Sequence, residues 1–101
     1  MPFDGSLSDV ATTLRRALAL FGPDGKNWIP YGYRWPQGWF CMVGALEEVM
    51  GLTYQETIKT PAYRALCEAA GVCVIARYND TPGRTFAEVR SVFERAIART
   101  T

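Results

Sequence analysis

Residues 72–97, VCVIARYNDTPGRTFAEVRSVFERAI, hold the strongest structural signals in the chain. The first part, Val72–Tyr78, is rich in β-branched and apolar residues, which predicts a strand that is buried on both faces. Thr85 and Glu88 then have the spacing of a capping box, and the apolar residues that follow recur at helical spacing as far as about Ile97. This stretch therefore predicts a strand, a turn and an amphipathic C-terminal helix.

Three segments nearer the N-terminus carry helical signals. Apolar residues fall on one face from about residue 7 to residue 21, which predicts an amphipathic N-terminal helix. Residues 41–50 show similar spacing and end at a glycine, and Thr60-Pro61 supplies an N-cap and a first-turn proline for a helix that continues to about Ala70. Between these two central helices, residues 53–59 are consistent with a capped helical turn.

The segment 26–40, KNWIPYGYRWPQGWF, has a different composition from the rest of the chain. Two prolines and two glycines exclude a continuous helix and favour short irregular strands or a hairpin. We therefore expect an α+β fold in a small single domain spanning residues 1–101. Its amphipathic N- and C-terminal helices would pack with two central helices and a short β-sheet.

The overall composition excludes several classes of function. Eleven basic and ten acidic residues give a net charge of +1, without the excess that drives general nucleic-acid binding. The alternative of a basic face rests on four arginines of the terminal helices: Arg15, Arg16, Arg95 and Arg99. No apolar stretch reaches the roughly 20 residues of a membrane span, and no secretory signal is visible, so we expect a cytoplasmic protein that does not enter a membrane.

The chain also lacks the residues on which common catalytic and metal sites depend. It contains no histidine, which removes the usual general base near neutral pH and the usual Ser/His and Cys/His arrangements. Its three cysteines form no C-x-x-C pair, so a structural zinc site is not expected. We expect no catalytic residue, no bound metal and no cofactor, and a binding protein rather than an enzyme.

Aromatic residues are concentrated in the segment 28–40, which holds six of the thirteen aromatic side chains. Large rigid rings on a turn-rich segment suit protein-binding hot spots, because they bury much area at little cost in side-chain entropy. The alternative is that the rings build the core of a small domain. The candidate partner-binding residues are Tyr33, Arg34, Trp35 and Trp39.

A second hypothesis places a small-molecule or cysteine-dependent enzymatic site around Cys41, Asn79 and Asp80. Cys41 precedes a predicted helix, whose N-terminus could stabilise a thiolate. Asn79 and Asp80 lie in a loop, where functional side chains are common, although both residue types also form turns. Asp80 could instead accept hydrogen bonds from a Trp indole or from the backbone of the aromatic segment.

Three short motifs in this order resemble a family of short uncharacterised proteins from actinobacteria and their phages. They are Trp28, the run Cys41-Met42-Val43-Gly44-Ala45-Leu46, and Tyr78-Asn79-Asp80 followed by a Thr85-capped helix. The resemblance covers roughly residues 14–97 and implies a fold and a habitat, but no reaction and no catalytic residue. The aromatic insert 33–39 is richer than the family pattern.

The function we expect from the sequence is that of a small phage or bacterial accessory protein that binds a host or partner protein and inhibits or redirects it. The aromatic insert and the missing catalytic bases motivate this hypothesis. A homodimer is a further expectation, because a short chain with so many apolar rings could cover some of them in a second copy.

Overall fold

The structure is a computed structural model, and it describes residues 7–32 and 34–101. Six helices and one pair of very short strands make up the regular structure in this part of the chain. The elements follow the order α1 (Leu7–Leu20), β1 (Arg34–Trp35), β2 (Trp39–Phe40), α2 (Met42–Met50), α3 (Tyr54–Thr57), α4 (Pro61–Ala70), α5 (Ile75–Asn79) and α6 (Phe86–Thr100).

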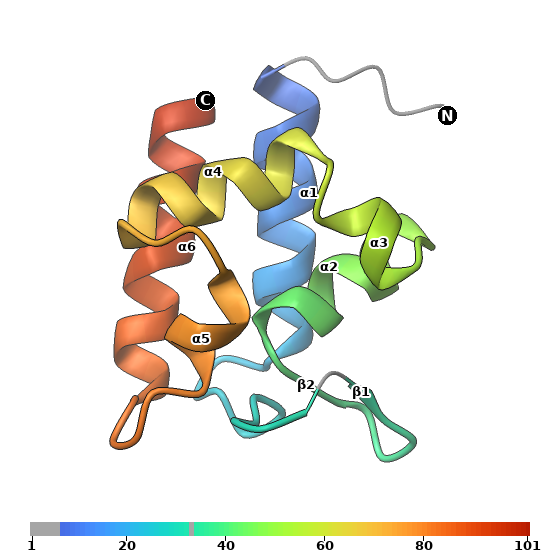
Figure 1. Ribbon diagram of the computed structural model, residues 1–101, viewed down its shortest axis with the longest axis vertical. Helices are drawn as coiled ribbons and strands as arrows, with labels where there is room; N and C mark the ends of the chain where they lie inside the picture. Colours follow the sequence, from blue (N-terminus) through green and yellow to red (C-terminus); the bar gives the residue numbers. More distant parts are fainter. Residues whose placement is uncertain (1–6, 33) are drawn as a thin grey trace.

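The two terminal helices form the frame of the molecule. Helices α1 and α6 lie side by side and antiparallel, and α4 crosses them (Figure 1). Helix α2 packs against α1, while the short helices α3 and α5 flank α2. The β1–β2 hairpin projects at one end of the bundle, below α2 in this view (Figure 1). The molecule therefore has a helical body and one small β appendage.

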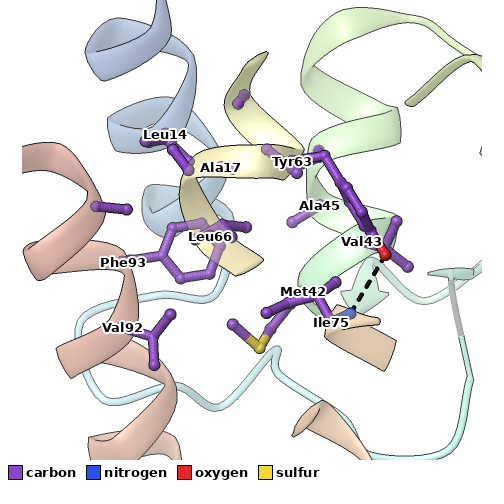
Figure 2. Close-up of a cluster of buried hydrophobic side chains, with 14 of the residues drawn as sticks. Leu14, Ala17, Met42, Val43, Ala45, Tyr63, Leu66, Ile75, Val92 and Phe93 are labelled. Atoms are coloured by element: carbon purple, nitrogen blue, oxygen red, sulfur yellow. Dashed lines mark hydrogen bonds between the residues drawn. The ribbon is translucent and has the colours of Figure 1, made fainter. Parts of the chain in front are cut away.

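The apolar side chains predicted to face inward meet in one core. Five helices contribute to it, and Figure 2 shows Leu14 of α1, Met42 of α2, Leu66 of α4 and Phe93 of α6 converging there, all fully buried. Ile75 of α5 completes this side of the core, and its backbone N–H donates to the hydroxyl of Tyr63 at 3.2 Å (Figure 2). The core therefore joins segments from both ends of the chain.

The helix boundaries follow the predicted signals closely. Thr53 and Thr85 each cap a helix through a complete capping box with the glutamate three residues later. Thr60 caps α4, which begins at Pro61 as predicted. Gly71 ends α4 in the left-handed conformation, with φ of 71°, a backbone state that favours glycine. These local predictions are confirmed.

The predicted α+β fold with a sheet is wrong. Helices account for 60% of the described residues and strands for 4%, so the fold is mostly helical. Of Val72–Tyr78, predicted as a buried strand, residues 72–74 form a short link and Ile75–Tyr78 belong to helix α5. Cys73 and Val74 are exposed, Val72 and Tyr78 are partly buried against the core, and only Ile75 is fully buried in it. A lone apolar strand leaves its backbone groups unpaired, whereas a helical turn satisfies them locally.

Candidate functional site

Residues 21–25, which follow α1, pack closely against the ring of Phe86 at the start of α6. Gly25, with φ of 78°, lies directly under the ring of Phe86, so that a Cβ at this position would come within 2.1 Å of the ring. Phe86 also meets Phe21 edge-on, with ring centroids 5.8 Å apart. Only glycine satisfies both the backbone angle and the space at residue 25.

Asn79, at the end of α5, is the centre of a buried hydrogen-bond network. Its side chain is fully buried, and its Oδ1 accepts the indole N–H of Trp28 at 2.7 Å and the backbone N–H of Met42 at 3.1 Å. Its Nδ2 donates to the carbonyl of Ile29 at 3.1 Å and to the carboxylate of Asp80 at 2.9 Å. One amide therefore joins three segments that are far apart in the sequence, and we refer to this set of hydrogen bonds as the Asn79 network.

Asp80 extends this network to the chain that leads into the hairpin. Its Oδ1 accepts the backbone N–H of Tyr31 at 2.8 Å, one of the two roles expected for it from the sequence. Tyr31 has φ of 62°, a left-handed conformation that is uncommon for a side chain of this size. The contact with Asp80 supports this backbone turn, which leaves the Tyr31 side chain 62% exposed.

Backbone hydrogen bonds also join residues 27–29 to β2. The N–H of Ile29 donates to the carbonyl of Phe40 at 3.0 Å, and the N–H of Phe40 donates to the carbonyl of Asn27 at 2.8 Å. Phe40 also packs its ring against the core. The base of the hairpin is therefore held to the helical body by both backbone and side-chain contacts.

Beyond this base, two tryptophans of the hairpin face solvent. Trp35 and Trp39 are directly paired across the two strands, which places their side chains on the same face. They are 48% and 40% exposed. The indole of Trp35 rests on the backbone of Gly32, where a Cβ would lie 2.7 Å from its Nε1. We call the exposed rings of Tyr31, Trp35 and Trp39 the aromatic surface.

A shallow, open depression lies next to this surface. It is lined by five residues of the hairpin and α2: Trp35, Pro36, Gly38, Phe40 and Glu48. Its lining is almost evenly divided between polar and apolar surface and includes one carboxylate. The depression therefore brings part of the aromatic surface beside the exposed face of α2.

The other candidate partner-binding residues lie in the same hairpin. The backbone of Arg34 pairs with Phe40 in the strand register. Tyr33 lies outside the described residues. The structure therefore brings Trp35 and Trp39 together. Tyr31, which the sequence hypothesis did not single out, is exposed and directly precedes Gly32, the residue that the Trp35 indole contacts.

The three residues of the alternative pocket are neighbours, but they serve the fold. Cys41 is buried and caps α2, with its Sγ accepting the N–H of Gly44 at 3.3 Å. Burial raises the pKa of this thiol from 9.0 to about 11, despite the opposing hydrogen bond from Gly44. The side chains of Asn79 and Asp80 form the hydrogen bonds of the Asn79 network and the bond to the backbone of Tyr31. This arrangement opposes thiolate chemistry at Cys41.

The arginines of the alternative basic face make contacts with the chain itself. Arg95 donates to Ser91 at 2.7 Å and to the carbonyl of Ala69 at 3.2 Å. Arg99 lies 4.0 Å from the carboxylate of Glu68. These contacts mix charges of both signs on α4 and α6, which is typical of a solvated helix face.

Two absences concern only the part of the chain that the structure describes. Within residues 7–32 and 34–101, no group of three Cys, Asp or Glu side chains is arranged to hold a metal ion. In the same ranges, no helix is both long and apolar enough to cross a membrane.

A family model matches residues 6–99, which include the whole Asn79 network and every helix and strand except the last residue of α6. The chain belongs to DUF6197, a family of unknown function. Neither the curated proteins nor the solved structures yield a match to it. Membership in DUF6197 therefore assigns no reaction and no ligand, and functional inference depends on the geometry described above.

The central position of Asn79 does not follow from the sequence, which points only to a pocket or a turn at this residue. Asn79 belongs to the motif Tyr78-Asn79-Asp80 of the family resemblance. Trp28 belongs to another motif of the same resemblance, and the two side chains are direct hydrogen-bond partners. The signal was present as two separate motifs, and only the fold connects them.

Proposed function

We propose that this protein acts by binding another protein through the aromatic surface formed by Tyr31, Trp35 and Trp39. The observation that carries the proposal is the exposure of Trp35 and Trp39 on one face of a hairpin whose base is fixed to the core. Tryptophan and tyrosine dominate binding hot spots, and rings that are already held in place lose little entropy on binding.

Two further observations support binding rather than catalysis. The chain has no histidine, and its buried thiol Cys41 has a raised pKa. The Asn79 network uses buried polar groups to hold the chain that presents the rings, instead of exposing those groups to a substrate.

The biological setting of this proposal follows the family resemblance noted from the sequence. The protein would be an accessory protein of a phage or an actinobacterium, and its partner would be a cytoplasmic host protein that it inhibits or redirects. These details extend the proposal and depend on partner binding through the aromatic surface.

An affinity-capture experiment tests the proposal. The tagged protein is incubated with lysate of the bacterium in which it is produced, and captured proteins are compared by quantitative mass spectrometry. Trp35→Ala and Trp39→Ala are expected to reduce capture of a specific partner at least tenfold, because each removes a central ring. Val74→Ala is the matched control, since it removes an exposed apolar side chain far from the hairpin in sequence. Equal capture by all variants would refute the proposal.

A further inference from the structure

The size of the aromatic surface limits the kind of partner it can bind. Its three rings are 62%, 48% and 40% exposed. At about 150–250 Å² for a full aromatic side chain, this amounts to roughly 225–375 Å² of exposed area. A stable interface between two folded proteins buries about 800 Å² on each partner. The rings alone therefore suit a short peptide segment better than a second copy of this chain.

The hairpin is also poorly suited to two common modes of peptide binding. Each strand has only two paired residues, Arg34–Trp35 and Trp39–Phe40, so it offers too short an edge for an added β-strand. An amphipathic helix needs a groove for anchors spread over two turns, whereas the depression beside the hairpin is shallow and open.

A segment in the polyproline II conformation fits the remaining features. Proline-rich segments dock on exposed aromatic rings, and they are already extended, so they lose little entropy even on a small surface. The rings of Trp35 and Trp39 share one face, and the indole of Trp35 packs against the backbone of Gly32. A prearranged aromatic face of this kind is what stacking against proline rings requires.

We propose that the aromatic surface binds a proline-rich segment of its partner in the polyproline II conformation. This inference rests on the proposed function, because it names the chemistry of the partner at the same surface. Binding involves no covalent step. Proline rings pack on Trp35, Trp39 and Tyr31, and the backbone carbonyl groups of a polyproline II segment stay free to accept hydrogen bonds.

Titration with an acetylated, amidated decaproline peptide, followed by ¹H–¹⁵N NMR, tests this inference. The chain has three tryptophans, and the indole signal of Trp28 is an internal control because its N–H is bonded to Asn79. Decaproline is expected to shift the indole signals of Trp35 and Trp39 saturably and to leave that of Trp28 in place. A Gly-Ser peptide of equal length should cause no saturable shift.

Two variants connect the binding to the rings. Trp39→Ala should weaken decaproline binding at least tenfold, and Val74→Ala should leave it unchanged. Tyr31→Gly is a second variant that removes a ring and preserves the left-handed backbone. It still tests the role of the rings if Trp39→Ala fails to fold. Tyr31→Gly is expected to weaken binding about threefold or more.

Three results would overturn the inference: no saturable shift with millimolar decaproline, unchanged affinity in both ring variants, or a concentration-dependent dimer that Trp39→Ala abolishes. The last result, measured by sedimentation, would assign the surface to a second copy. If decaproline fails while the ring variants still lose a captured partner, the proposed function stands and only the peptide class is wrong. If decaproline binds and no captured protein depends on the rings, the proposed function fails instead.

Discussion

Trp28 and Trp39 lie eleven positions apart in one aromatic segment, yet they have opposite surroundings. The indole of Trp28 packs against the core and donates its N–H to a buried amide at 2.7 Å, whereas Trp39 is 40% exposed on the hairpin. A ring whose polar atom has a buried partner serves the fold, and a ring held at the surface remains available for another molecule. The comparison shows that one aromatic cluster can serve both purposes.

The largest expected effect is a difference in stability between variants of Trp28 and Trp39, and it tests this comparison directly. Trp28→Ala should lower the free energy of unfolding by about 4 kcal/mol, because it removes a large packed ring and one of the two hydrogen bonds that Asn79 Oδ1 accepts. Trp39→Ala should lower it by less than about 1 kcal/mol, because an exposed ring contributes little to the core. Urea denaturation of both variants measures the difference. Equal losses in the two variants would contradict the division of the cluster.

The Asn79 network provides the next test. Asn79→Ala should destabilise the protein by about 3 kcal/mol, because it leaves the N–H groups of Trp28 and Met42 and the carbonyl of Ile29 without their partner. Arg77→Ala, at an exposed position of the same short helix, is the control and should change stability by less than about 0.5 kcal/mol. A loss below about 1 kcal/mol for Asn79→Ala would show that the network is not essential to the fold.

The packing of the segment onto α6 can be tested with two glycines of similar backbone conformation. Gly25 and Gly83 have φ of 78° and 82°, but only Gly25 has a ring in the place of its missing Cβ. Gly83→Ala should cost about 1 kcal/mol for the left-handed backbone alone. Gly25→Ala should cost about 2 kcal/mol more, because Phe86 must move. The difference, measured by thermal denaturation, isolates the ring contact, and equal costs would exclude it.

The smallest effect concerns the pH dependence of stability. The pKa of Cys41 is 9.0 as an ordinary thiol and about 11 in the folded protein. The unfolded chain therefore loses this proton first, so the stabilisation is fully present below pH 9 and is lost as the pH rises toward 11. At pH 10 the loss should be about 1 kcal/mol.

Cys41→Ser is the matched variant for this effect, since a serine can cap α2 in the same way without titrating in this range. The loss of stability between pH 8 and pH 10 should be smaller in this variant than in the original protein by that amount. Iodoacetamide labelling at pH 8 gives an independent check, because exposed Cys73 should react at least a hundredfold faster than buried Cys41. Rapid labelling of Cys41 would contradict both its burial and its raised pKa.

Sequence alone was sufficient where a local signal determines the structure. The capping pairs at Thr53 and Thr85 and the proline after Thr60 depend only on neighbouring residues, and all three helix starts are confirmed. The buried faces of the terminal helices could be predicted equally well, because their apolar residues recur at helical spacing.

The error at residues 72–78 has a different origin. A short apolar run is compatible with a strand or with a buried helical turn, and periodicity does not distinguish them. The choice depends on a partner strand, which the described part of the chain does not provide for this segment, and on the hydroxyl of Tyr63, which accepts the N–H of Ile75. The Asn79 network was equally hidden, because its partners come together only when the helices pack.

The long sequence separations in the Asn79 network bear on how the protein folds. Its three contacts to other segments join residues that are 51, 50 and 37 positions apart. Closing loops of that length costs chain entropy, and Asn79 reaches Met42 only once α5 lies against α2, so these bonds are expected to form after those two helices have paired. The segment 28–40, which carries the exposed rings, would then be ordered last during refolding. This segment would also open first in native-state hydrogen exchange, and the amide of Met42 and the indole of Trp28 would lose protection together.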